Sequence, residues 1–128
     1  MAKGQKLHQE HQDAVSVFGK SIGKRAGFHC EWCSGSDGLR LWEYQPDREP
    51  APENLALLCE SCRALAASKS ADPHQLRSVR NALWSDVPAV AEGAALVLAR
   101  SGESWAREAI EESFIDEELK QRLTSGRL

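Results

Sequence analysis

Four cysteines carry the clearest chemistry in this chain of 128 residues. They form two Cys-x-x-Cys pairs, Cys30 with Cys33 and Cys59 with Cys62, and 25 residues lie between the pairs. Two intervening residues let both thiolates of a tight turn reach one ion, and two such turns complete a tetrahedron with Zn–S distances of about 2.3 Å. The spacing therefore predicts one Zn²⁺ ion held by all four cysteines.

The alternatives to zinc are a redox dithiol and four unrelated buried thiols. A thioredoxin-like dithiol requires a βαβ context around one pair, and the sequence has none. Four thiolates also close the coordination shell, whereas a catalytic zinc keeps three protein ligands and one open position. We therefore expect a structural metal, which holds together a loop (residues 34–58) with few large apolar residues.

The distribution of charge limits the partners. The net charge of −3 excludes a polycation that binds nucleic acid through bulk charge. Residues 1–29 nevertheless contain five basic and two acidic residues, so the remainder of the chain is acidic. The basic residues are Lys3, Lys6, Lys20, Lys24 and Arg25. This asymmetry predicts a contact with RNA or DNA through Lys20, Lys24 and Arg25, although a protein partner or a solvated helix face explains it equally well.

The sequence also indicates where the protein works. It has no apolar run of about 18 residues, so we expect no transmembrane helix and no membrane partner. Residues 1–12 are polar and basic, with no apolar stretch behind them, which argues against a secretory signal. We therefore expect a cytoplasmic protein, and the pattern carries no signal for an oligomeric state.

The elements that position the cysteines begin with a helix. Val15, Phe18 and Ile22 have helical spacing, which predicts a basic amphipathic helix over residues 8–25 with one narrow buried face. Gly27 is a natural end for this helix, and the first cysteine pair follows it.

Strand patterns then alternate with helical ones. Residues 39–44 alternate as a strand does, and Asn54–Leu58 is a short apolar run that leads into the second cysteine pair. From residue 69 onward the apolar residues mostly recur with helical spacing. The expected fold is α+β, with a small Cys₄ zinc ribbon between an N-terminal helix and a C-terminal helical subdomain. The corresponding segments are residues 1–28, 29–68 and 69–128.

The ribbon resembles the zinc-supported ββα core of HNH endonucleases. In that family an Asn-Leu run, here Asn54-Leu55, leads into the second cysteine pair, and a His at the end of the first strand activates water. Trp42-Glu43-Tyr44 occupies the strand end here, and Arg63 stands where that family often has His or Asn. The catalytic His is therefore missing from the pattern.

This departure decides the prediction about catalysis. Phosphodiester hydrolysis needs a general base and usually a divalent metal beside it. No His lies between the two cysteine pairs, so we predict no catalytic residue. The alternative, a divergent HNH-type nuclease, would depend on Glu43, with His29 and Asp47 as its companions.

A second resemblance, to another family, rests on several segments that follow one another over about 100 residues. They are Phe18-Gly19-Lys20 with the first cysteine pair, Leu41-Trp42-Glu43-Tyr44, the second cysteine pair, Trp84-Ser85-Asp86-Val87-Pro88-Ala89-Val90, Trp105-Ala106-Arg107 and Phe114-Ile115-Asp116-Glu117-Glu118. Together they resemble the PhnA family, the alkylphosphonate-utilisation operon proteins. The resemblance implies a zinc ribbon and a helical C-terminal half, while the operon association names the family without giving it a catalytic role.

The sequence as a whole predicts a PhnA-like zinc-binding protein that is not an enzyme. We expect it to act as a binding or adaptor module whose partner is RNA, DNA or another protein. The alternative functions are a divergent HNH-type nuclease and an enzyme of phosphonate metabolism.

Overall fold

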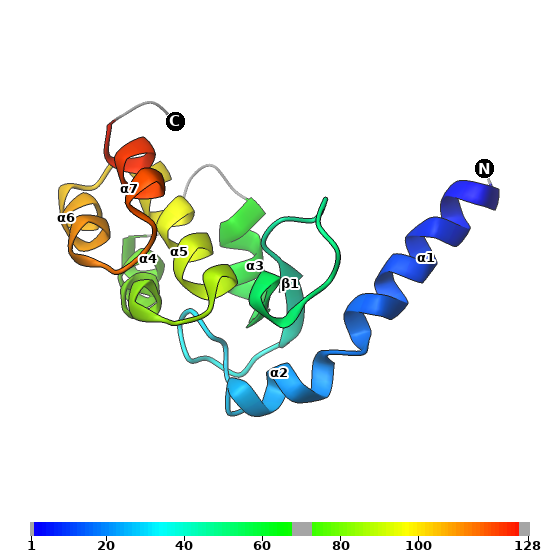
Figure 1. Ribbon diagram of the computed structural model, residues 1–128. Coiled ribbons are helices and arrows are strands. Elements are labelled where there is room, and N and C mark those ends of the chain that lie inside the picture. The colour runs from blue at the N-terminus through cyan, green and yellow to red at the C-terminus, as the bar shows by residue number, and fades with distance from the viewer. Residues whose placement is uncertain (1, 68–72, 126–128) are drawn as a thin grey trace.

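The chain forms seven α-helices and one two-stranded sheet within residues 2–67 and 73–125, the part that the computed structural model describes, with the backbone alone for residues 2–8. The helices are α1 (Ala2–Ser16), α2 (Gly19–Arg25), α3 (Glu60–Ala67), α4 (Pro73–Val79), α5 (Pro88–Arg100), α6 (Ser104–Glu112) and α7 (Glu117–Thr124). The strands are β1 (Arg40–Glu43) and β2 (Leu55–Leu58), and two 3₁₀ helices are η1 (Pro52–Asn54) and η2 (Arg80–Trp84). The predicted α+β fold, with a small ribbon between N-terminal and C-terminal helices, is confirmed (Figure 1).

Some of the predictions fall outside the described residues. The boundary placed between residues 68 and 69 lies in the segment 68–72, and the ends of the first and last predicted segments lie at residues 1 and 126–128. The side chains of Lys3 and Lys6 also lie outside the description.

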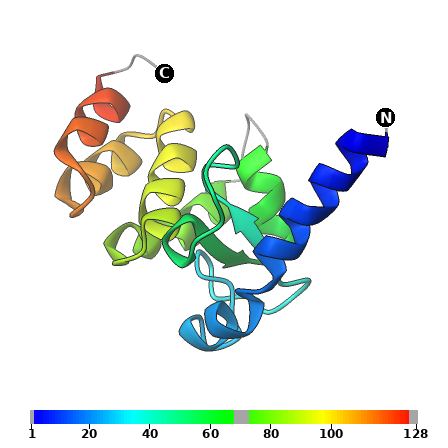
Figure 2. The same ribbon diagram turned by 45° about the vertical axis from the view of Figure 1, so that its right-hand side comes forward.

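The single N-terminal helix predicted from the sequence is wrong, because the chain forms α1 and α2 with a bend between them. At the end of α1, the Ser16 hydroxyl donates to the Asp13 carbonyl (2.8 Å). The amide of Phe18 donates to the carbonyl of Val15 (3.1 Å), which tightens the last turn into the 3₁₀ pattern. The Phe18 carbonyl then accepts from the amide of Ile22 (3.0 Å) and so begins α2. Figures 1 and 2 both show the N-terminal end of α1 projecting away from the body of the molecule.

The two strands form an antiparallel ribbon that a polar side chain closes. The paired residues are Arg40 with Leu58, Leu41 with Leu57, Trp42 with Ala56, and Glu43 with Leu55. The Asn54 amide bridges the loop beyond β1, because its Nδ2 donates to the Gln45 carbonyl (2.9 Å) and its Oδ1 accepts from the Gln45 amide (3.1 Å). These two hydrogen bonds join the beginning and the end of the loop between β1 and β2.

Both faces of β2 are buried, which explains why its residues are continuously apolar. Successive side chains of a strand point to opposite faces. Leu55 and Leu57 form a small cluster with Val15 and Ile22 of the N-terminal helices. Ala56 and Leu58 belong instead to the main core, which the C-terminal helices supply. The ribbon is thus sandwiched between α2 and the helical body.

Helix α5 is the centre of that body and the surface on which the ribbon rests. The indole of Trp32 donates to the Val90 carbonyl (3.1 Å) and meets Trp42 edge-on, with 5.2 Å between ring centroids. Both rings cover Gly93, where an added Cβ would lie 2.9 Å from Trp42 and 3.1 Å from Trp32. Glycine at this position therefore lets two indoles pack directly on the helix backbone. Within the described ranges, no helix combines the length and apolar character needed to cross a membrane.

Candidate metal centre

The four cysteines meet at one end of the ribbon, with their Sγ atoms all within 4.8 Å of one another. In the part of the chain that the structure describes, no other group of three or more His, Cys, Asp or Glu side chains has this arrangement. A tetrahedron with Zn–S bonds of about 2.3 Å has S···S edges of about 3.8 Å, close to the 3.6 Å between Cys33 and Cys59. That separation is also far longer than the roughly 2.05 Å of a disulfide, and all four thiols are free.

Backbone amides donate to three of the sulfurs, as in metal-binding turns. The amides of Trp32 and Cys33 lie 3.4 and 3.5 Å from the Cys30 sulfur. The Gly35 amide lies 3.4 Å from the Cys33 sulfur, and the Cys62 amide lies 3.4 Å from the Cys59 sulfur. Such contacts favour the thiolate over the thiol, because each N–H dipole stabilises negative charge on sulfur. The two turns are therefore shaped to present thiolates.

The thiols of the cluster share hydrogen bonds. The contact between Cys30 and Cys62 lowers the pKa of the Cys30 thiol and raises the pKa of the Cys62 thiol. Burial raises the pKa of Cys33. A divalent cation displaces the protons that such a cluster holds, because a coordinating thiol loses its proton to the field of the ion.

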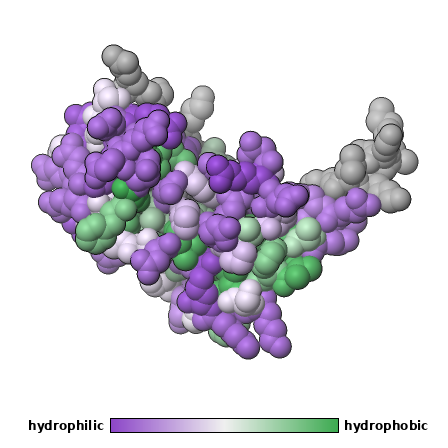
Figure 3. Space-filling model, viewed as in Figure 1, coloured by the Kyte–Doolittle hydropathy of each residue, from purple (hydrophilic) through white to green (hydrophobic). Residues whose placement is uncertain are grey.

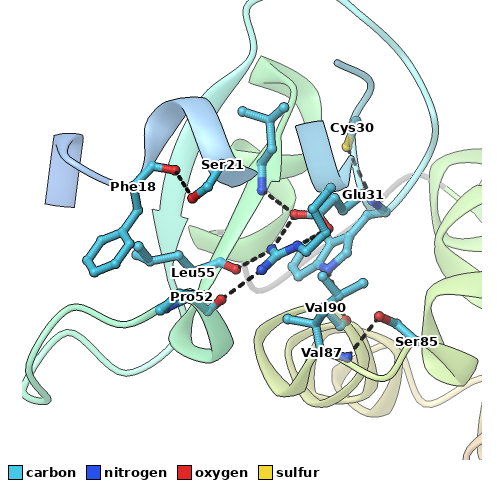
Figure 4. A network of polar contacts seen from close by, with 12 residues as sticks. Phe18, Ser21, Cys30, Glu31, Pro52, Leu55, Ser85, Val87 and Val90 are labelled. Atoms are coloured by element: carbon cyan, nitrogen blue, oxygen red, sulfur yellow. Dashed lines mark hydrogen bonds and ion pairs between the residues drawn. The ribbon is translucent and has the colours of Figure 1, made fainter. Parts of the chain in front are cut away.

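The first cysteine pair is fixed to the sheet by the residue inside it, Glu31. Its amide donates to the Leu57 carbonyl (2.8 Å), and its Oε1 accepts from the Leu57 amide (2.8 Å). Its carboxylate also forms a two-pronged ion pair with Arg25, whose Nη2 and Nε lie 2.7 and 2.9 Å from Oε1 and Oε2 (Figure 4). The Arg25 guanidinium then donates to the carbonyls of Pro52 (2.9 Å) and Leu55 (2.7 Å). We call this network the Arg25–Glu31 clamp.

The clamp changes the role of one residue predicted to contact nucleic acid. The Glu31 side chain is 9% exposed and that of Arg25 is 26% exposed, and every nitrogen of the guanidinium has a partner within the protein. Lys20 and Lys24, predicted for the same contact, are both exposed on α2. The structure thus places Arg25 in the framework of the site and leaves the two lysines on its surface.

The second cysteine pair has an anchor of its own. Arg63, the residue after Cys62, donates through Nη1 to the carbonyls of Leu58 and Gly38. This position, where HNH endonucleases often have His or Asn, therefore ties the end of β2 to the loop that precedes β1.

The strand-end carboxylate Glu43 has a partner that sequence reasoning missed. The Nε2 atom of His11, on α1, lies 2.8 and 3.0 Å from the two carboxylate oxygens of Glu43. The companions considered from the sequence, His29 and Asp47, are exposed and form no such group with Glu43 among the described residues. Because His11 is 32 residues away from Glu43, only the docking of α1 brings the pair together.

Comparisons of the chain with protein-family models, with curated proteins and with solved structures found no match. The features that indicate a function are therefore those of the chain itself. They are four thiols gathered to hold a metal ion, an ion-pair clamp that joins them to α2, and two lysines exposed on that helix.

Proposed function

We propose that the chain is a PhnA-like zinc protein, in which Cys30, Cys33, Cys59 and Cys62 hold one structural Zn²⁺ ion. The observation that carries this proposal is the convergence of the four Sγ atoms within 4.8 Å. Tetrahedral sets of four thiolates suit zinc or iron–sulfur chemistry, and paired Cys-x-x-Cys turns that close on a small ribbon are typical of structural zinc. Zinc content of one ion per chain, measured by atomic spectrometry, tests the assignment.

The second part of the proposal is that the protein is a binding module. Four thiolates leave no coordination position for a substrate or a water molecule. The metal instead stabilises the ribbon against which α2 packs, and so fixes the direction in which α2 faces solvent. We propose a cytoplasmic protein whose α2 contacts the phosphates of a nucleic acid.

The charges of α2 support this contact. Lys20 and Lys24 are four residues apart, so they lie on one face of the helix. Arg25 holds that helix on the ribbon through its contacts with Glu31, Pro52 and Leu55. Figure 3 shows apolar surface near the junction of α1 and α2, where Val17 is 77% exposed, with hydrophilic surface beside it. A local basic face on an acidic protein favours a short contact with phosphates over extensive wrapping.

Charge reversal on α2 is expected to weaken nucleic-acid binding. Replacing Lys20→Glu and Lys24→Glu together removes two phosphate contacts, which should lower the slope of log Kd against log salt by about two. Fluorescence anisotropy of a labelled oligonucleotide over a range of salt concentrations measures both affinity and slope. Arg107→Glu reverses an exposed charge on α6 and is the control. Equal effects of the two kinds of variant would contradict a specific contact at α2.

The His11–Glu43 pair supports a second candidate function, a divergent HNH-type nuclease. An imidazole paired with a carboxylate is a suitable general base, and it lies at the end of β1, where the resemblance places the catalytic His. Under this candidate, Glu43→Gln is expected to abolish Mg²⁺-dependent nicking of a supercoiled plasmid. If the zinc-loaded wild type does not cut the plasmid with Mg²⁺ or Mn²⁺, this candidate is excluded.

A further inference from the structure

The end of α2 holds an aromatic residue in an unusual backbone conformation. The amide of Gly27 donates to the Lys24 carbonyl (3.1 Å) and the amide of Phe28 donates to the Gly23 carbonyl (2.9 Å), which is the Schellman pattern of helix termination. Gly27 has the positive φ (63°) that this motif requires. Phe28 follows with a φ of 59°, a region that bulky residues rarely occupy because Cβ crowds the backbone.

Apolar burial does not explain why a phenylalanine is held there. Phe28 is 60% exposed, and its ring rests on Gly23, where an added Cβ would lie 2.8 Å from ring atom Cε1. The apolar contact that often accompanies a Schellman motif joins two side chains, and here the residue beneath the ring has none. The ring therefore gains little burial from a backbone position that is itself unfavourable. A strained conformation that displays an exposed group is typical of functional positions.

The surroundings of the ring are cationic. The ring rests on Gly23, which is three residues after Lys20 and directly before Lys24, so it lies on the turn of α2 that carries both exposed lysines. The position of the ring is also fixed, because Cys30 of the metal centre follows two residues later and its amide donates to the Gly35 carbonyl (2.7 Å). The metal centre thus anchors a short segment that displays one aromatic ring next to two positive charges.

We propose that Phe28 is a stacking platform for an unpaired base, and that the partner of α2 is consequently a single-stranded nucleic acid. This inference rests on the proposed nucleic-acid contact and specifies its substrate class. Lys20 and Lys24 bind the backbone phosphates on either side of the stacked base. Proteins that bind single strands combine cationic side chains with aromatic rings in this way, whereas the bases of a duplex are already stacked and cannot reach a protruding ring.

The chain supplies a matched control at its other end. Phe114, between α6 and α7, is 86% exposed and is therefore even more accessible than Phe28. It lines a small cleft together with the acidic residues Asp86, Glu92 and Asp116. Carboxylates repel phosphates, and this ring has acidic neighbours where Phe28 has lysines. It should therefore not bind nucleic acid.

The test uses the zinc-loaded full chain and three fluorescein-labelled probes. They are an oligouridylate and an oligothymidylate of about 12 nucleotides, within the site size of single-strand binders, and a duplex of the same length. Phe28→Ala is expected to weaken binding to both single strands about tenfold and to leave duplex binding unchanged. Phe28→Tyr should bind as the wild type does, because it keeps the flat ring. Phe28→Leu should behave as Phe28→Ala does, because it keeps apolar volume without the ring, and Phe114→Ala should have no effect.

Each outcome separates this inference from the function on which it rests. If Phe28→Ala binds single strands as tightly as the wild type while the Lys20 and Lys24 variants lose binding, the stacking platform is wrong and the phosphate contact stands. A wild type that prefers the duplex also overturns the platform. If the wild type binds none of the three probes, the proposed nucleic-acid contact fails and the platform fails with it. Zinc content and circular dichroism establish that each variant is folded, and Phe28→Leu carries the test if Phe28→Ala does not fold.

Discussion

Removal of the proposed zinc ion by a strong chelator is expected to unfold the ribbon and to loosen the helices packed on it. The ribbon consists of two strands of four residues each, and an isolated two-stranded hairpin is at best marginally stable in water. Structural zinc contributes about 10–16 kcal/mol in small zinc-binding peptides. The entire unfolding free energy of a typical domain is about 5–15 kcal/mol. Loss of the ion should therefore remove more stabilisation than the other contacts of the small ribbon supply, while the helices keep contacts with one another.

The consequences should extend beyond the ribbon, because β2 takes part in both apolar clusters. Leu55 and Leu57 bury one face against the N-terminal helices, and Ala56 and Leu58 bury the other in the main core. Near-UV circular dichroism should therefore lose most of its intensity on chelation, since Trp32 and Trp42 lose their fixed packing on α5. Far-UV helicity should decline less, and added Zn²⁺ should restore both signals.

Single substitutions at the metal centre sharpen this prediction. Cys62→Ser is expected to abolish stoichiometric zinc and to reproduce the spectrum of the chelated protein, because Cys62 is fully buried and serine is a poor zinc ligand. Ser61→Ala, at an exposed position of the same turn, is the control and should retain one zinc per chain. A chelated protein with an unchanged near-UV spectrum and melting temperature would show that the ion does not stabilise the fold.

The convergence of the four cysteines was predictable because its signal is local. Two residues between cysteines already determine that a tight turn can direct both thiolates at one ion, and two such turns need only be brought together. The alternation of residues 39–44 and the apolar run of Asn54–Leu58 likewise indicate the two strands that bring them together, and both strands occur within those limits. Local periodicity and ligand chemistry were sufficient for this part of the site.

The contacts that orient the centre were not predictable in this way. Arg25 is the last residue of α2 and Glu31 lies six residues later, beyond the end of that helix, so no helix periodicity pairs them, and His11 and Glu43 are 32 residues apart. Both pairs exist only because α2 and α1 dock on the ribbon. The bend at Phe18 is similar, because the sequence around it has helical spacing and the change of direction depends on hydrogen bonds at the end of α1. Tertiary packing decides such features, and one sequence carries little local signal for it.

Breaking the Arg25–Glu31 clamp is expected to destabilise the zinc-loaded protein by about 2–4 kcal/mol. This is less than the loss expected for a fully buried ion pair, because Arg25 is partly exposed. Arg25→Ala leaves a mostly buried carboxylate without its countercharge and deprives the carbonyls of Pro52 and Leu55 of their donor. Arg25→Lys should also lose stability, since an ammonium cannot reproduce two parallel hydrogen bonds and two further contacts. Urea unfolding monitored by tryptophan fluorescence measures the change.

The matched control is the neighbouring residue, because Lys24→Ala removes an exposed charge from the same turn of α2 and should change stability by less than about 0.5 kcal/mol. The double variant with Arg25→Ala and Glu31→Gln should be less destabilised than the sum of the single variants, since the glutamine carries no unpaired charge. A phosphate contact at Arg25 would also make Arg25→Ala bind nucleic acid less tightly, so a binding assay cannot tell the two roles apart. The unfolding free energy measured without nucleic acid distinguishes the two roles, because only the clamp requires Arg25→Ala to lower it. An unchanged unfolding free energy would contradict the clamp and favour a phosphate contact at Arg25.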